Sequence, residues 1–218
     1  MMKFRQAPTV QPRLAIDVYD QILHAIVNGQ FKPGERLIQE QIAEEINVSR
    51  TPVREALLRL EQEGVLEQSG RKGFSIRDIS DDEVRSMYGA REAIEGYAAY
   101  RLAASGTPEA LAELKISVDA ELQPGQRTLE QEFIVNRDIH RLIVEQTGNR
   151  VLLDMFQNLW NRGISLWLFA STQTGKEIPE PEAHLDLYNV IADGTPEEAH
   201  SEMIQHIRNG LKLHLNED

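Results

Sequence analysis

The sequence contains no cysteine among its 218 residues, which excludes disulfide bonds and metal sites built from thiolates. It also lacks any segment that resembles a signal peptide and any apolar run long enough to cross a membrane. No internal repeat or low-complexity tract is present. We therefore expect a soluble, cytoplasmic protein that has no membrane partner.

Positive charge is scarce as well, because 23 Lys and Arg oppose 35 Asp and Glu and leave a formal net charge of −12. The deficit lies in one part of the chain. Residues 1–79 carry 11 basic and 11 acidic side chains, whereas residues 80–218 carry 12 and 24. We expect two domains with these bounds. The first can present cations to nucleic acid, and the acidic second should be repelled by it.

The most informative segment is VSRTPVREAL, at residues 48–57. On a helical period its valine, alanine and leucine side chains form an apolar stripe, while Arg50, Thr51 and Arg54 gather on another face. Ser49 suits the N-cap position, and the proline that follows fits in the first turn. The pattern predicts a helix with one face in a core and a polar face at its positive end.

A short apolar pattern and a tight connection precede this helix, so the segment Gln39–Leu66 is typical of a helix-turn-helix. In that arrangement arginine can pair with guanine, and serine or threonine can contact a base or a phosphate. Gly70 and Gly73 then bracket Arg71 and Lys72, which predicts a hairpin with two cations at its tip. Such a hairpin after a helix-turn-helix is a wing.

These features resemble the winged-helix domain of the GntR transcription regulators. The resemblance spans residues 15–79 and rests on DVYDQILHAIVNGQFKPGERL and EQIAEEINVSRTPVREALLRLEQEGVLEQ. It implies that the chain binds a short palindromic operator in double-stranded DNA as a homodimer. The DNA-contacting positions that it implies are Ser49, Arg50, Thr51, Arg54, Gly70, Arg71, Lys72 and Gly73.

From Ser80 onward the sequence predicts helices and no further sheet. Capping residues followed by Pro or Glu mark several helix starts, and Gly or Pro marks the breaks. The expected helices are 81–104, 108–122, 129–147, 150–171, 181–192 and 196–215. The predicted fold is therefore mainly α, with a winged helix-turn-helix domain that carries a small β-hairpin and an all-α antiparallel bundle of about six helices.

Three histidines fall on apolar helical faces: His140, His184 and His206. Asn136 lies four residues before His140, on the same face. A single histidine in such a place is more often a packed core residue, but three suggest convergence in the bundle core. Imidazole suits Zn, Ni, Co or Mn, and side chains at i and i+4 can bind one ion.

The region from residue 80 to about 212 resembles the FCD ligand-binding domain of the fatty-acid-regulator (FadR) subfamily of GntR proteins. The resemblance rests on NRDIH at 136–140 and on the interval between His184 and His206. It implies a divalent metal held at Asn136, His140, His184 and His206. The family more often has aspartate at the first of these positions, so a neutral amide here should hold the ion less firmly.

Arg91 and Glu95 interrupt the apolar face of the helix that begins at Asp81. Buried charges are costly unless they are paired or functional. One interpretation is an intrahelical pair at i and i+4. The other is that Arg91 binds an anionic effector, because a guanidinium matches a carboxylate bidentately. Arg162, between two tryptophans, is a weaker candidate for the same role.

The leading hypothesis is a transcription regulator, a repressor rather than an enzyme, that responds to a small organic acid bound in the metal-containing bundle. One alternative is a metal-responsive regulator in which the ion itself is the effector. A second is a metal-dependent hydrolase, although Glu145, the nearest extra carboxylate in sequence, lies off the histidine face.

Overall fold

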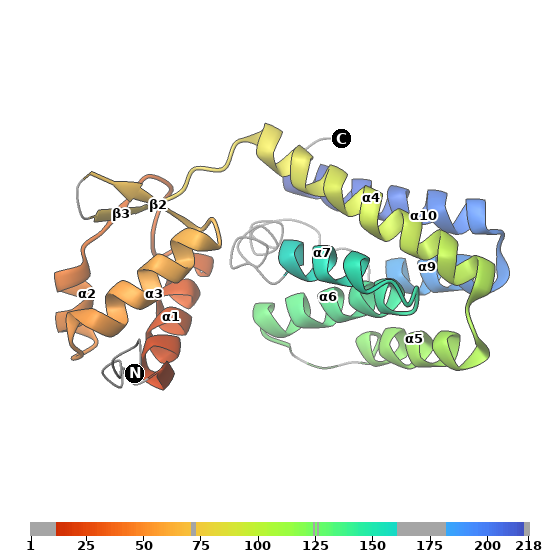
Figure 1. Ribbon diagram of the computed structural model, residues 1–218, viewed down its shortest axis with the longest axis horizontal. Coiled ribbons are helices and arrows are strands. Elements are labelled where there is room, and N and C mark those ends of the chain that lie inside the picture. Colours follow the sequence, from red (N-terminus) through yellow and green to blue (C-terminus); the bar gives the residue numbers. More distant parts are fainter. Residues whose placement is uncertain (1–11, 71–72, 124, 126, 161–181, 216–218) are drawn as a thin grey trace, which may run out of the picture. The chain divides into compact units, whose positions relative to one another are not determined.

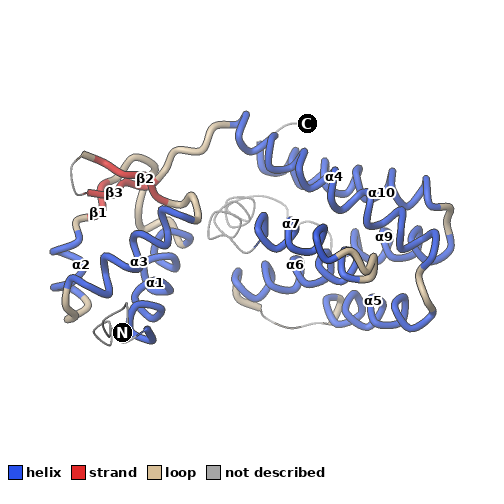
Figure 2. The backbone as a smooth tube through the Cα atoms, viewed as in Figure 1, coloured by secondary structure: helices blue, strands red, loops and turns tan. Residues whose placement is uncertain are grey.

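The computed structural model describes residues 12–70, 73–123, 125, 127–160 and 182–215, and its helices, strands and loops are shown in Figures 1 and 2. The chain forms two compact units that divide between Asp78 and Ile79. The sequence places this division one residue later. Within the described part of the chain, no helix is long and apolar enough to span a membrane.

The described residues of the first unit form three helices and a small sheet. In chain order these are α1 (Pro12–Val27), β1 (Arg36–Leu37), α2 (Gln39–Glu45), α3 (Arg50–Gln62), β2 (Leu66–Ser69) and β3 (Gly73–Ile76). The sheet is antiparallel, with β3 between β1 and β2. The predicted hairpin is thus β2 and β3, while α1 and the two-residue strand β1 were not anticipated from the sequence.

Helix α3 forms where the sequence predicts it, with Ser49 in an extended N-cap conformation. Its apolar stripe is buried, as Val53, Leu57 and Leu60 each expose 0% of their surface. The stripe packs against α1. Asn47 joins α2 to α3 with a φ of 53°, a left-handed conformation that asparagine tolerates better than most residues. This core fixes which side of α3 faces solvent.

The second unit is a helical bundle. Its described helices are α4 (Asp81–Ser105), α5 (Pro108–Glu121), α6 (Leu129–Glu145), α7 (Arg150–Trp160), α9 (Glu182–Asp193) and α10 (Pro196–Leu215). The fold class inferred from the sequence is therefore confirmed. The expected helix over 150–171 is described only to Trp160, and residues 161–181 lie outside the described part of the chain.

Local capping sets several of these helix starts. The side chains of Ser80 and Thr107 accept hydrogen bonds from backbone N–H groups three residues later, at 3.3 and 3.2 Å. Thr195 does the same for α10 at 3.2 Å, and the Glu198 carboxylate accepts from the Thr195 backbone N–H at 2.8 Å. These are the helix starts that the sequence predicts, because a cap depends only on residues within one turn.

The core of the bundle draws apolar side chains from all of its described helices. Helices α4 and α10 lie side by side along much of their length (Figure 1). Gly96 of α4 permits this approach, because a Cβ there would lie 3.3 Å from side-chain carbons of His200 and Ile204 on α10. Helices α6, α9 and α10 each contribute side chains to this core.

Candidate DNA-binding face and metal centre

The polar face of α3 is exposed, as the sequence predicts. Ser49, Arg50, Thr51 and Arg54 all expose their side chains at or just after the helix start. Ser49 caps the helix by position only, since its hydroxyl makes no capping hydrogen bond. The positive end of a helix, two guanidinium groups and two hydroxyls therefore share one surface that can meet a groove of DNA.

Two residues at the start of α2 contact Arg50, which the sequence analysis did not foresee. The Gln39 amide donates to the Arg50 carbonyl at 2.8 Å, and a guanidinium nitrogen of Arg50 lies 3.1 Å from a Glu40 carboxylate oxygen. The ion pair is well exposed on both sides, so it contributes at most about 1 kcal/mol. Glu40 therefore holds the Arg50 side chain only weakly.

The predicted wing corresponds to the antiparallel strands β2 and β3. Gly70 has a φ of +67°, the left-handed region that a tight hairpin turn requires. A Cβ at Gly73 would lie 2.8 Å from the Ser69 carbonyl oxygen, so a side chain does not fit there. Arg71 and Lys72 lie outside the described residues.

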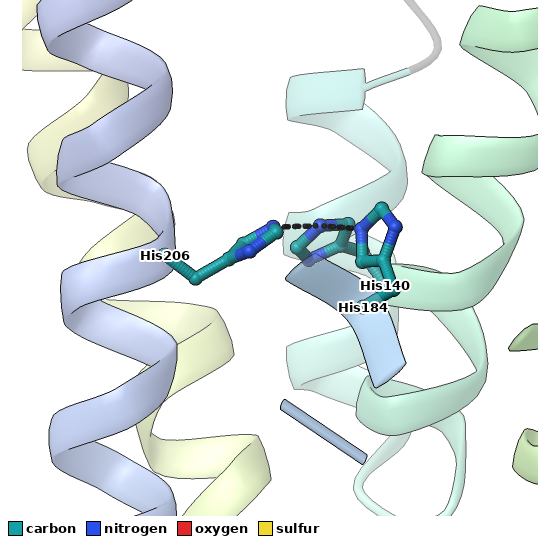
Figure 3. Close-up of side chains that lie close together, drawn as sticks. All are labelled: His140, His184 and His206. Atoms are coloured by element: carbon teal, nitrogen blue, oxygen red, sulfur yellow. Dashed lines mark hydrogen bonds between the residues drawn. The ribbon is translucent and has the colours of Figure 1, made fainter. Parts of the chain in front are cut away.

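The three histidines converge in the bundle core, as Figure 3 shows. His140 comes from α6, His184 from α9 and His206 from α10. The Nε2 atom of His140 lies 3.2 Å from Nε2 of His184 and 3.2 Å from Nε2 of His206. A tetrahedral Zn²⁺ with N ligands at about 2.05 Å needs N–N separations of about 3.3 Å. We refer to these residues as the histidine cluster.

Asn136 fits the same centre as an oxygen donor. It lies one turn before His140 on α6, and its side-chain Oδ1 is buried without a hydrogen-bond partner among the described residues. A buried acceptor that makes no hydrogen bond is unfavourable by about 1–3 kcal/mol. A cation or its bound water would satisfy this atom, so the residues present suit a divalent metal.

Sequence reasoning missed the carboxylates behind the histidines. Glu95, whose side chain is 0% exposed, places Oε2 2.6 Å from the Nδ1 atom of His140, a close contact although the angle is poor for a hydrogen bond. Glu121 places a carboxylate oxygen 2.8 Å from Nδ1 of His184. The sequence shows Glu95 as a charge on an apolar helical face, but it does not show that His140 is its partner. No sequence pattern points to Glu121.

Arg91 forms an ion pair with Glu95 one turn along α4, which agrees with the first of the two interpretations of Arg91 from the sequence. Its Nε donates to Glu95 Oε1 at 2.9 Å and its Nη2 donates to Oε2 at 3.3 Å. The guanidinium carbon lies 4.4 Å from a ring centroid of Trp160, and the side chain is 15% exposed. The structure thus connects Arg91 to the histidine cluster through Glu95. Arg162 lies outside the described residues.

Burial and the neighbouring charges set the ionisation of this centre. Burial lowers the pKa of His140 to about 4, although the Glu95 carboxylate opposes that shift. Burial likewise lowers the pKa of His206 well below its ordinary value, and the other two histidines add to the effect. Burial alone would raise the pKa of Glu95, but Arg91 and His140 hold it well below its usual range. At neutral pH, His140 and His206 are therefore neutral imidazoles, the form that binds metals.

Comparison with known proteins identifies both units. Residues 14–76 match the family described as bacterial regulatory proteins, gntR family, and residues 86–209 match the FCD domain. The regulator McbR of Escherichia coli is 32% identical over 181 residues, which cover 82% of this chain and 80% of McbR. The chain belongs to the gntR family. This gntR-family chain is thus a transcription regulator with a helix-turn-helix DNA-binding domain and an FCD domain, and not an enzyme.

Other matches agree. The uncharacterised regulator YdhC of Bacillus subtilis is 33% identical over 146 residues, 66% of this chain and 65% of YdhC. A protein of Paenarthrobacter nicotinovorans, named as a probable D-xylose utilization operon transcriptional repressor, is 27% identical over 198 residues, 89% of this chain and 85% of that one. The solved structure of E. coli McbR superposes with a TM-score of 0.65 over 95% of this chain and 99% of McbR at 23% identity, a likeness in fold.

Proposed function

We propose that this gntR-family regulator is a repressor that binds a short palindromic operator as a homodimer. A small organic acid, bound at a divalent metal ion in the FCD domain, weakens that binding. The ion is Zn, Ni, Co or Mn, and the histidine cluster together with Asn136 holds it. Ser49, Arg50, Thr51 and Arg54 of α3 contact the operator, and the wing tip from Gly70 to Gly73 adds phosphate contacts.

The convergence of the three Nε2 atoms carries this proposal. The three imidazoles gather in the interior, with Nε2 of His140 at a separation from each of the other two Nε2 atoms that suits one ion, next to the unsatisfied Oδ1 of Asn136. Nitrogen and oxygen donors of this kind favour first-row divalent metals. When bound, the ion supplies positive charge that attracts a carboxylate. All four protein ligands are neutral, so the ion's charge is not reduced by its own ligands.

Arg91 supports an acid as the effector. Arg91 is linked to the centre through Glu95, which contacts both Arg91 and His140. Its two hydrogen bonds to Glu95 hold the guanidinium in place, so a carboxylate would meet an oriented cation. Repression in particular is supported by the D-xylose operon relative, which is named as a probable repressor.

The same contacts favour a second candidate, a regulator for which the ion alone is the effector. Two nitrogen atoms of Arg91 are already engaged with Glu95, and the histidine cluster is complete without any organic ligand. A hydrolase does not agree with the family to which this chain belongs, which consists of transcription regulators.

One experiment distinguishes these candidates. Operator duplexes would be selected from a random-sequence library by the parent protein, and binding would be followed by fluorescence anisotropy. The protein would be metal-free, loaded with Zn²⁺, or loaded with Zn²⁺ and a panel of small carboxylic acids. We expect at least one acid to weaken operator binding only in the loaded protein. A response to Zn²⁺ alone, unchanged by any acid, would favour the metal sensor.

His140→Ala serves as the matched variant. It should lose the metal, measured by elemental analysis, and should bind the operator whether or not the acid is present. If parent and variant retained equal metal, the histidine cluster would not be the metal site. If the acid acted equally on both, the effector would bind elsewhere.

A further inference from the structure

Two of the three histidines have a carboxylate against the ring nitrogen that faces away from the centre of the cluster. His140 Nδ1 contacts Glu95 of α4, and His184 Nδ1 contacts Glu121 at the end of α5. Both carboxylates are largely shielded from solvent, with side-chain exposures of 0% and 11%. Neither comes from a helix that carries a histidine of the cluster.

This arrangement determines where the imidazole protons lie. A carboxylate only accepts hydrogen bonds, so each Nδ1 beside one should carry the proton. A neutral imidazole has a single N–H, and the Nε2 atoms of His140 and His184 must then be bare lone pairs. The two Nε2 atoms lie 3.2 Å apart, and with both Nδ1 atoms protonated neither Nε2 can donate a hydrogen bond to the other. A metal ion between them would bind both lone pairs.

We propose that Glu95 and Glu121 are positioning residues of the metal centre, which fix the tautomer of His140 and His184 and supply the negative charge that the neutral ligand set lacks. The inference rests on the proposed metal site and names residues that the resemblance does not. Carboxylates in this position orient a histidine ligand and raise its basicity. The charge of Glu121, which contacts His184, compensates for the neutral amide of Asn136.

The two carboxylates differ in how they act. Glu95 is held by further donors, because its Oε1 also accepts from Trp160 Nε1 at 3.0 Å and Arg91 binds both of its oxygens. Arg91 offsets its charge, so the main effect of Glu95 is to orient His140. Glu121 contacts His184, and among the described residues it forms no ion pair with Lys or Arg, so its charge acts more directly on the ion.

The test measures the Kd of Zn²⁺ by competition with a chromogenic chelator, using the full-length protein. Glu121→Gln and Glu95→Gln keep the size of each side chain and remove its charge. Matched controls are Asp119→Asn, which breaks the exposed pair with Lys115 on α5, and Glu92→Gln on α4, which breaks the pair with Arg208 of α10. We expect each positioning variant to bind Zn²⁺ about 10–100-fold more weakly, and the controls to stay within about twofold of the parent.

A second readout concerns the protons and needs no metal. In ¹⁵N–¹H correlation spectra of the metal-free parent at neutral pH, His140 and His184 should show protonated Nδ1 and bare Nε2. Glu121→Gln should bring the opposite tautomer of His184 into view. A structural role alone would not change these signals.

The outcomes separate this inference from the proposed function. If the parent binds Zn²⁺ and His140→Ala abolishes binding, but both glutamine variants retain the parental Kd, the carboxylates do not position the site while the metal site stands. Protonated Nε2 on His184 in the parent would overturn the inference as well. Should Glu95→Gln fail to fold, Glu121→Gln decides the question, because Glu121 lies nearer the surface. A parent that binds no Zn²⁺ overturns both.

Discussion

Lowering the pH should destabilise the FCD domain of the metal-free protein, because His140 is buried in its neutral form. Its folded-state pKa is about 4, against an ordinary value of 6.5. The unfolded chain therefore binds a proton at a pH where the folded protein does not. The stability due to the neutral His140 is fully present above pH 6.5 and is lost as the pH falls toward 4.

The size of the effect follows from those two values. A difference of one unit between the folded and unfolded pKa values changes the free energy of unfolding by about 1.4 kcal/mol. The full loss of stability from His140 is therefore about 3 kcal/mol, of which about 2 kcal/mol falls between pH 7.5 and 5. Burial lowers the pKa of His206 in the same direction and makes the loss steeper. The pKa of Glu95 is lowered in the folded protein, so protonation of Glu95 reduces stability only as the pH approaches and falls below its ordinary pKa of 4.5.

Urea unfolding followed by tryptophan fluorescence at several pH values would measure this. Both tryptophans, Trp160 and Trp167, belong to the second unit by sequence, so the signal reports that unit. His140→Gln should lose much of the pH dependence. Added Zn²⁺ should stabilise the parent near neutral pH and stop doing so in acid, as protons displace it. A free energy of unfolding that is constant from pH 7.5 to 5, or an equal slope in parent and His140→Gln, would refute the reasoning.

Three further predictions concern single substitutions. Arg54→Ala should weaken operator affinity by about 1–3 kcal/mol in anisotropy titrations without changing the melting temperature, and an unchanged affinity would remove α3 from the interface. Asn136→Asp should raise Zn²⁺ affinity in the chelator assay, since it adds a negative charge at nearly constant size; equal or weaker binding would exclude this side chain as a ligand. Arg91→Lys should keep its charge near Glu95 but lose the bidentate geometry, so calorimetry should show acid binding weakened by about 1.5–3 kcal/mol, with Arg101→Lys on the same helix unchanged. Equal acid affinity in parent and Arg91→Lys would leave Arg91 as a structural pair only.

The sequence by itself determined the features that depend on neighbours within a turn or two of helix. Ser49 and Pro52 mark the start of α3. The helical period of α3 separates its buried apolar stripe from its exposed arginines. The capped starts of α4, α5 and α10 follow from the same short-range rules. The pairing of Arg91 with Glu95 was also accessible, because i and i+4 side chains on a helix are neighbours whatever the tertiary fold.

Tertiary structure decided what depends on residues far apart in the sequence. Strand β1 is two residues long and exists only because β3, nearly forty residues later, offers it a hydrogen-bonding edge. The sequence indicated that the three histidines face inward, but a helical period gives an orientation and not a distance. Only the packing of α6, α9 and α10 brings their Nε2 atoms together, and only the packing of α4 and α5 places Glu95 and Glu121 behind them. The period of a helix determines the direction in which a side chain points, but the packing of the helices against one another determines which residues it contacts.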